Sequence, residues 1–361
     1  MKTLLLGDFS PTDVTDPLFR EKKIDTLFTD SISLFEGNDV NLVNFECAIT
    51  EPVGLIDKFG PGLHCCEEVA QVLKEVGVNY CALSNNHIFD FGKNGFYNTI
   101  RVLEKNGMKL TGFGENEADS RRDLIVEKDG EKIAIVNVCE HEYSYALENR
   151  CGCRAFDPFD TMEDIRKAKE TADRVIVLYH GGKEQCEYPS PRLMKLCRAM
   201  VKNGADVVLC QHSHCIGAYE QFEGGHILYG QGNYHFVKQS KHENWYTALA
   251  VKYDTKSHEI QFIPLHMLEE GIELAKGELA EKIMAGFKAR SASLQDGTWI
   301  EGWRAFCEMK RVPYTKILQN AFKEDSTPRD DQKFAHYLDC EAHTDVWREL
   351  FKTANHTNEL D

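Results

Sequence analysis

Short apolar runs alternate with helix-like segments through the first two thirds of the chain. Five of these runs end on polar side chains, and each is bounded by turn-forming or polar residues, which is typical of buried β-strands. They cover residues 3–8, 40–46, 79–87, 174–180 and 206–214. Strands that alternate with helices indicate βα units and a largely parallel sheet. The pattern therefore predicts an α/β fold.

Two helices have clear start signals. Ser190 and Pro191 open one helix, apolar residues then recur at helical spacing, and Gly204 closes it. The second helix is predicted to follow Thr161, because Asp164 stands three residues later in the spacing of a capping box.

Three predicted hairpins add antiparallel strands. The first turns at Asp129 and Gly130, the second at Gly224 and Gly225, and the third between residues 254 and 258. The third hairpin closes the α/β part near residue 270, after which helix formers dominate. We therefore expect an α/β domain over residues 1–270 and a helical extension or cap over residues 271–361.

Composition and charge narrow the class of protein. The 361 residues are 42% hydrophobic, which is ample for a buried core. A net charge of −16, from 42 basic and 58 acidic residues, disfavours nucleic acids and anionic membranes as partners. The chain has no apolar run of the ~20 residues that span a bilayer, and MKTLLLGDFS is too short for a signal peptide. We expect a cytoplasmic protein without a membrane segment.

Thirteen cysteines without an export signal favour reduced, buried thiols over a disulfide framework. A zinc site built from Cys65, Cys66, Cys151 and Cys153 is a less favoured alternative. Neither pair has the two-residue spacer of common zinc knuckles.

The polar strand ends carry side chains that can bind metal. In a parallel sheet the carboxyl ends lie along one edge, so these side chains are expected to converge. They are Asp8, Glu46, Asn86, His180, His212 and His214. His212 and His214 stand two residues apart and would point the same way in an extended strand. This mixture of oxygen and nitrogen ligands suits a pair of divalent first-row metals better than a structural zinc.

Several of these residues have ordinary structural interpretations when taken singly. Asp8 fits a turn or helix cap, Asn86 fits a turn, and a lone histidine fits a hydrogen-bonded core position. Glu46 is harder to explain in this way, because a buried carboxylate without a partner is costly.

The ordered motifs GDFS, NFECAIT, SNNHIFDFG, HGGKEQCEYP, QHSHC and YGQGNYHF extend from about residue 3 to residue 237. Together they resemble the CapA family of poly-γ-glutamate capsule biosynthesis proteins, within the calcineurin-like metallophosphatase superfamily. The resemblance implies a four-layer α/β/β/α sandwich with a dinuclear site of manganese, iron or zinc between two sheets.

The resemblance also implies a role for each site residue. Asp8 would bind the first metal, Glu46 would bridge, Asn86 and His180 would hold the second, and His212 and His214 would complete the pair. His87 corresponds to the catalytic histidine of the superfamily. Asp90 would orient its ring, or would instead cap the helix near Asn94.

Two positions depart from the superfamily pattern. Ser10 stands where a histidine ligand is usual, which puts full occupancy of the first metal in question, and Gln211 stands where glycine is usual. Candidate substrate contacts are Glu184, Tyr188 and Asn233, and His235 would line the same pocket.

The implied function is a metal-dependent hydrolase that cleaves a phosphoester, or less readily an amide, with a hydroxide activated by two metals. The substrate would be a small phosphoester or an anionic polymer, with a link to poly-γ-glutamate. Two alternatives stay open. One is a non-catalytic polymer-binding component, favoured by Ser10, and the other is a cyclic-nucleotide phosphodiesterase.

Overall fold

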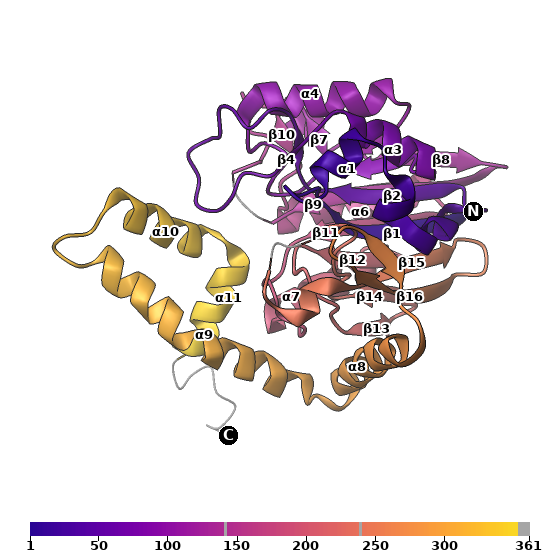
Figure 1. Ribbon diagram of the computed structural model, residues 1–361. Coiled ribbons are helices and arrows are strands. Elements are labelled where there is room, and N and C mark those ends of the chain that lie inside the picture. The colour runs from indigo at the N-terminus through magenta and orange to yellow at the C-terminus, as the bar shows by residue number, and fades with distance from the viewer. Residues whose placement is uncertain (141–142, 238–239, 353–361) are drawn as a thin grey trace.

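Two β-sheets face each other in the computed structural model, which describes residues 1–140, 143–237 and 240–352 (Figure 1). The first sheet has seven strands in the order β17 (Ile272–Leu274), β16 (Glu259–Met267), β15 (Thr247–Asp254), β1 (Lys2–Phe9), β2 (Val40–Phe45), β5 (Tyr80–Ala82) and β6 (Lys109–Thr111). The second has six strands in the order β13 (Tyr219–Phe222), β14 (Gly225–Leu228), β12 (Val207–Gln211), β11 (Arg174–His180), β9 (Glu131–Cys139) and β8 (Leu124–Lys128).

Smaller elements complete the structure. Two short strand pairs are β3 (Ala48–Ile49) with β4 (His64–Cys65), and β7 (Phe113–Gly114) with β10 (Gly152–Cys153). The helices before residue 270 are α1 (Asp16–Arg20), α2 (Ile24–Phe28), α3 (Glu68–Val76), α4 (Gly92–Lys105), α5 (Glu117–Ser120), α6 (Pro158–Thr171) and α7 (Pro191–Lys202), with 3-10 turns η1 (Thr29–Phe35) and η2 (Glu243–Tyr246).

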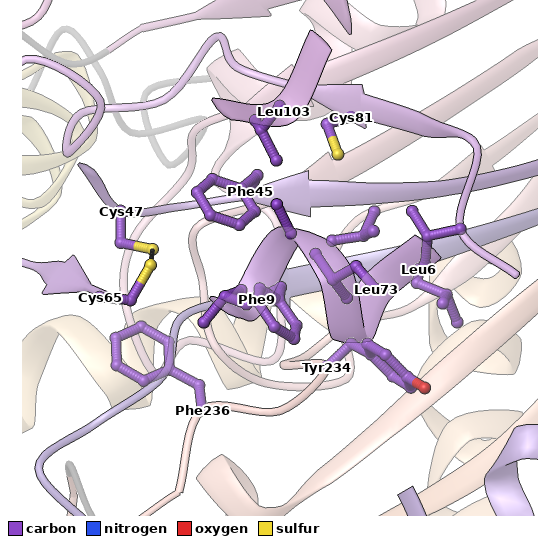
Figure 2. Close-up of a cluster of buried hydrophobic side chains, with 14 of the residues drawn as sticks. Leu6, Phe9, Phe45, Cys47, Cys65, Leu73, Cys81, Leu103, Tyr234 and Phe236 are labelled. Atoms are coloured by element: carbon purple, nitrogen blue, oxygen red, sulfur yellow. Dashed lines mark hydrogen bonds between the residues drawn. The ribbon is translucent and has the colours of Figure 1, made fainter. Parts of the chain in front are cut away.

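Alternation along each strand divides the core into layers. On β1, Leu5 joins a cluster between the two sheets that also contains Leu178 of β11. Leu4 and Leu6 point to the opposite face and pack against α3 and α4. Figure 2 shows Leu6 with Leu73 of α3 and Leu103 of α4 in this outer cluster. Successive side chains of a strand face opposite ways, so one apolar strand supplies two layers.

A third cluster places α6 and α7 against the outer face of the second sheet. The order of layers is therefore helix, sheet, sheet, helix, and the predicted four-layer sandwich is confirmed. The expectation of a single sheet edge is wrong. β1, β2 and β5 are parallel in the first sheet, whereas β11 and β12 are parallel in the second.

Local signals predicted some boundaries better than others. Helix α7 starts at Pro191, and the Ser190 hydroxyl accepts a hydrogen bond from the backbone N–H of Leu193. Helix α6 starts at Pro158, so the predicted start after Thr161 is wrong. Asp157 caps this helix, since its carboxylate accepts bonds from two backbone N–H groups of the first turn.

All three predicted hairpins are present as β8 with β9, β13 with β14 and β15 with β16. The first has a two-residue loop of Asp129 and Gly130, both at positive φ, as a type I′ turn requires. The second loop consists of Glu223 and Gly224, one residue earlier than predicted.

Strand β17 extends the first sheet past residue 270, and four helices follow it. We call these helices the helical arm: α8 (Gly277–Asp296), α9 (Trp299–Ala321), α10 (Pro328–Asp339) and α11 (Glu341–Leu350). The arm starts beside β13 and β16 and turns back toward the body at α10 and α11 (Figure 1). A boundary between two domains at residue 270 stays a prediction. Across the described ranges, no helix has the length and apolar character needed to cross a bilayer.

Candidate metal centre

Strand ends from both sheets meet at one place. Asp8 is the residue before the last in β1, Glu46 follows β2 directly, and His180 ends β11. All three are fully buried. The pairing of β1 with β2 shifts register between Leu6 and Asp8, and Gly7 sits at this irregularity. A Cβ on Gly7 would lie 2.0 Å from the carbonyl oxygen of Gly232, so only glycine fits there.

Two groups of three side chains have ligand atoms close enough to hold metal ions. One is Glu46, His180 and His212, and the other is Asp8, Glu46 and His214. Within each group the ligand atoms lie within 4.8 Å of one another. Glu46 belongs to both groups, which is the position that a bridging carboxylate would take.

His212 and His214 converge for a different reason than the one expected from sequence. Strand β12 ends at Gln211, so neither histidine lies in an extended strand. Their φ angles are 75° and 53°, in the left-handed region that non-glycine residues rarely adopt. Backbone strain of this kind persists where surrounding structure imposes it, often at functional sites.

Two asparagines hold the ring of His180 at its opposite nitrogens. The Asn86 side-chain oxygen lies 2.9 Å from His180 Nε2, and the Asn44 side-chain nitrogen lies 3.0 Å from His180 Nδ1. Asn44 Nδ2 also donates to Asp8 Oδ1 at 2.7 Å. The sequence prediction did not include Asn44. The feature of the sequence that could have indicated Asn44 is its polar side chain within the buried run VNLVNF.

Asn233 positions the ring of His214. Its side-chain oxygen lies 2.7 Å from His214 Nδ1, and its amide nitrogen donates to the carbonyl oxygen of Trp245. The same imidazole nitrogen lies 3.3 Å from Asp8 Oδ2. Asn233 therefore contacts a ligand-capable histidine, and it is absent from the residues that line the adjoining cavity.

Burial controls the protonation of the centre. Burial, and then the charge of Asp8, raise the pKa of Glu46 well above its ordinary value. Burial lowers the pKa of His180 to about 4. Burial would also lower the pKa of His214, but Glu46 and Asp8 outweigh it and raise the value to about 9. The same histidine, together with His180 and Asn44, holds the pKa of Asp8 below its ordinary value despite burial.

The unsatisfied carboxylate is the test of whether these residues fit metal ions. Neither oxygen of Glu46 has a hydrogen-bond partner among the described residues, although the side chain is fully buried. Such a group costs several kcal/mol unless a cation or donor compensates it. With carboxylate oxygens, an amide oxygen and imidazole nitrogens around it, the donor set fits two divalent first-row ions.

His87 belongs to a second polar chain beside the ligands. Its Nδ1 lies 2.7 Å from Asp90 Oδ2, and Lys58 binds the other oxygen of Asp90. The backbone N–H of Leu63 also donates to Asp90. Burial lowers the pKa of His87 to about 4, partly offset by Asp90. Asp90 therefore orients the His87 ring, and Lys58 is a partner that no local sequence pattern indicated.

A cavity of about 220 Å³ adjoins the centre. It is lined by Lys58, Phe59, Gly60, Pro61, Asn86, His87, Tyr143, Glu184, His212, His336, Tyr337 and His343. Of the predicted substrate contacts, Glu184 lies in this lining. Tyr188 does not, since its ring packs against Gly302 of α9. The last three lining residues come from the helical arm, which the sequence prediction did not connect to the site.

One predicted pocket residue and the two positions that depart from the superfamily pattern are absent from the cavity lining. His235 is buried among the rings of Phe9, Phe19 and Phe28 and does not line the cavity. Ser10 is buried and its hydroxyl donates to the carbonyl oxygen of Pro11. Gln211 is buried and its amide donates to the carbonyl oxygen of Leu6.

The thirteen cysteines are free and buried, as predicted. Neither of the two metal-capable groups found in the described chain contains a cysteine. The less favoured cysteine zinc site therefore gains no support from the geometry.

The sequence matches one protein family and several known proteins. Residues 2–238 match the family described as "Bacterial capsule synthesis protein PGA_cap". The chain is 31% identical to "Capsule biosynthesis protein CapA" of Bacillus anthracis over 176 residues, covering 47% of this chain and 43% of that protein. It is 28% identical to "PGA biosynthesis protein CapA" of Bacillus subtilis (strain 168) over 236 residues, covering 64% and 62%.

The chain thus spans less than two thirds of the length of either relative. Among solved structures, a hypothetical protein from Thermus thermophilus aligns with a TM-score of 0.46 at 15% identity. That alignment covers 73% of this chain and 98% of the other.

Proposed function

Since this chain belongs to the bacterial capsule synthesis protein family PGA_cap, we propose that it is a metal-dependent hydrolase whose substrate is a phosphoester. An amide is the less favoured substrate. A role in PGA biosynthesis, which the name of the Bacillus subtilis relative states for that protein, is part of the proposal.

The observation that carries the proposal is the shared carboxylate. Glu46 is fully buried, has no hydrogen bond among the described residues, and belongs to both ligand groups. Asp8, Asn86, His180, His212 and His214 would complete the coordination of two ions of manganese, iron or zinc. When bound, such ions supply Lewis-acid chemistry and activate water as a nucleophile.

The chain's own residues would supply proton transfer and positioning. The bond from His87 Nδ1 to Asp90 fixes the ring and leaves Nε2 available on a residue that lines the cavity. His87 would protonate the leaving oxygen from its imidazolium form as the ester bond breaks, since a neutral ring that donates Nδ1–H to Asp90 carries no proton on Nε2. Lys58 and the N–H of Leu63 hold Asp90, so Asp90 is a positioning residue for His87. Asn44 and Asn233 would do the same for the ligand histidines.

Elemental analysis combined with turnover tests the proposal. The purified chain, supplied with manganese, is expected to retain two equivalents of metal and to hydrolyse a phosphomonoester, a phosphodiester or a γ-glutamyl amide from a panel. Cyclic mononucleotides and dinucleotides belong in the panel as the phosphodiesterase alternative. Glu46→Gln should lose metal and turnover together, because it removes the group common to both ligand sets. Glu51→Gln, at an exposed position in the next segment, is the matched control.

A chain that binds no metal under any of these conditions would refute the proposal. Metal binding without turnover on the whole panel would favour the second candidate, a non-catalytic component that binds an anionic polymer. Ser10 favours that candidate, because its side chain is turned to the backbone of Pro11 at a position where the superfamily resemblance implies a ligand.

A further inference from the structure

The residues that line the cavity beside the candidate metal centre are of two chemical kinds. The polar ones include two candidate ligands and are Lys58, Asn86, His87, Glu184 and His212. The others are ring side chains grouped around His336: Phe59, Tyr143, His336, Tyr337 and His343. Three of those five rings belong to α10 and α11, so the helical arm supplies most of the ring-lined wall.

Helix α10 is fixed to the loop that carries the rest of this wall. The Arg329 guanidinium donates to the carbonyl oxygen of Lys58 at 3.2 Å and lies 4.7 Å from the centre of the Phe59 ring. The Gln332 amide donates to Asp57 at 2.6 Å. Figure 1 shows α10 extending toward this loop from the far end of the arm. The loop also carries Lys58, which binds Asp90, so the arm contacts the same segment that holds the catalytic candidate in place.

The rings contact one another across the junction, partly stacked and partly edge to face. His336 lies 5.4 Å from Phe59 and 6.0 Å from Tyr143, measured between ring centres. On the arm side, Tyr337 lies 3.8 Å from His343, whose Nδ1 lies 2.6 Å from the Tyr314 hydroxyl oxygen. The wall is therefore held by contacts on both sides, as a preformed pocket requires.

The size and the lining of the cavity restrict what can enter. A volume of about 220 Å³ lies below the ~300–1,000 Å³ typical of pockets for drug-sized ligands, so the interior of a polymer chain would not fit. A flat ring presents the shape and quadrupole that aromatic walls bind. An anionic phosphoryl group suits the opposite end, where the ligands and Lys58 lie.

We propose, building on the hydrolase function above, that the helical arm forms the leaving-group side of the substrate pocket. The substrate is then a small phosphomonoester whose leaving group carries a flat ring. Its hydrolysis forms a P–O bond to water, breaks the P–O bond to the leaving group, and releases inorganic phosphate. His87 gives a proton to the leaving oxygen, and the proton that the attacking water loses restores His87.

Substrate comparison across arm variants tests this proposal. Phenyl phosphate carries the ring, and glycerol 1-phosphate is a monoester without one. Tyr337→Ala and His336→Ala should each raise KM for phenyl phosphate about three- to tenfold while kcat stays the same. KM for glycerol phosphate should change less than twofold. Tyr337→Phe and His336→Phe should restore the original KM, because they restore a ring.

Leu338→Ala is the matched control, since Leu338 neighbours Tyr337 in α10 but is 57% exposed. It should leave both KM values unchanged. Thermal unfolding of each variant shows whether the arm still folds. If Tyr337→Ala does not fold, the His336 pair and the substrate comparison in the unaltered chain decide the question.

Binding of non-hydrolysable ligands provides a readout apart from turnover. Calorimetry with phenylphosphonate and methylphosphonate, on the manganese-loaded and the metal-free chain, should show tighter binding of the phenyl compound. Tyr337→Ala should abolish that preference. Equal binding of both phosphonates, or equal changes in KM for both esters, would overturn the assignment of the arm.

Different results would refute the hydrolase function and the ring-lined pocket. Absence of turnover with every ester sinks the hydrolase function, yet a preference for phenylphosphonate that depends on Tyr337 would still support the ring-lined pocket. Turnover without any preference for ring-bearing esters keeps the hydrolase and removes the role of the arm.

Discussion

The candidate metal centre and the helical arm face the same cavity but are built in opposite ways. Strand β2 is buried along its whole length and β11 along all but its first residue, so Glu46 and His180 extend from the core. Helix α10, by contrast, has no buried residue. The arm has one further cluster of buried residues, in which six arm residues pack with Cys186 of the segment before α7: Trp303, Phe306, Cys307, Tyr314, Val346 and Leu350.

This difference separates two tasks. Groups that perform chemistry need fixed positions, and a packed two-sheet core provides them. Regions with few buried contacts open at lower free energy than the core does. We therefore expect the ligand edge to determine the rate of the reaction and the arm to determine which substrate enters.

The largest expected effect is at the polar chain beside the ligands. His87→Ala should lower kcat about 10²–10⁴-fold, the usual contribution of a general acid, while metal content stays at the original level. Single-turnover kinetics and elemental analysis measure the two quantities. A loss of metal together with activity would mean that His87 supports the ligands and does not serve as the acid.

The next largest effect is expected where a side chain in the core between the two sheets is shortened, because the cavity that it leaves lowers the free energy of unfolding. Leu178 is fully buried and stands two residues before His180. Leu178→Ala should lower the free energy of unfolding by about 2–5 kcal/mol and weaken metal retention. Leu338→Ala in the arm should change it by less than about 0.5 kcal/mol. Chemical denaturation followed by far-UV circular dichroism compares the two, and similar losses would contradict the contrast between core and arm.

Docking of the arm should depend on pH through Asp345. Its carboxylate accepts hydrogen bonds from Ser190, which caps α7, and from Arg192 within α7. The other charged groups around it are Glu140, Glu341 and Arg348. Burial raises the pKa of Asp345 from 3.8 to about 6, in spite of Arg192. A raised carboxyl pKa favours the docked arm below pH 4, and this contribution is lost as pH rises through about 6.

The two pKa values differ by about 2, which corresponds to at most about 3 kcal/mol. Trp299, Trp303 and Trp347 lie in the arm, so tryptophan fluorescence during unfolding between pH 4 and pH 8 follows its release. Asp345→Asn should remove most of the pH dependence of this transition. An unchanged pH profile in that variant would show that other groups control docking.

The smallest effect is expected at the exposed end of the arm. Gln332→Ala removes one hydrogen bond to Asp57 and should cost about 0.5–1 kcal/mol or less in arm docking. KM for a ring-bearing ester should rise less than threefold. The same fluorescence assay measures the docking, and a loss above about 2 kcal/mol would show that the loop contact, and not the α11 contact, holds the arm.

Much of the site was predictable because its signals are local. A short apolar run that ends on Asp8, Glu46 or His180 marks, in the sequence itself, a strand end with a candidate ligand. The boundaries of α7 were predictable for the same reason, since Ser190 and Pro191 act within one turn. The start of α6 was missed because two adjacent cap signals compete, and Asp157 before Pro158 is the better one.

Other parts depend on contacts between distant segments. The sequence of β11 and β12 does not reveal that they join a different sheet from β1 and β2, because all four runs are equally apolar. The positive φ angles of His212 and His214 come from the surroundings of the loop. Lys58 and Tyr337 carry no local mark, since their place at the cavity depends on how a loop and a helix fold back.

Local sequence already encodes that Asp8, Glu46 and His180 lie at or beside strand ends, because a polar residue after an apolar run is a signal confined to a few positions. The tertiary structure alone decided that two sheets bring those ends together, that Glu46 is shared by both ligand groups, and that α10 and α11 close the cavity. The two kinds of information act over different distances along the sequence. Burial patterns along a strand act over neighbouring residues, whereas the meeting of residues 8, 180 and 337 depends on the packing of the whole chain.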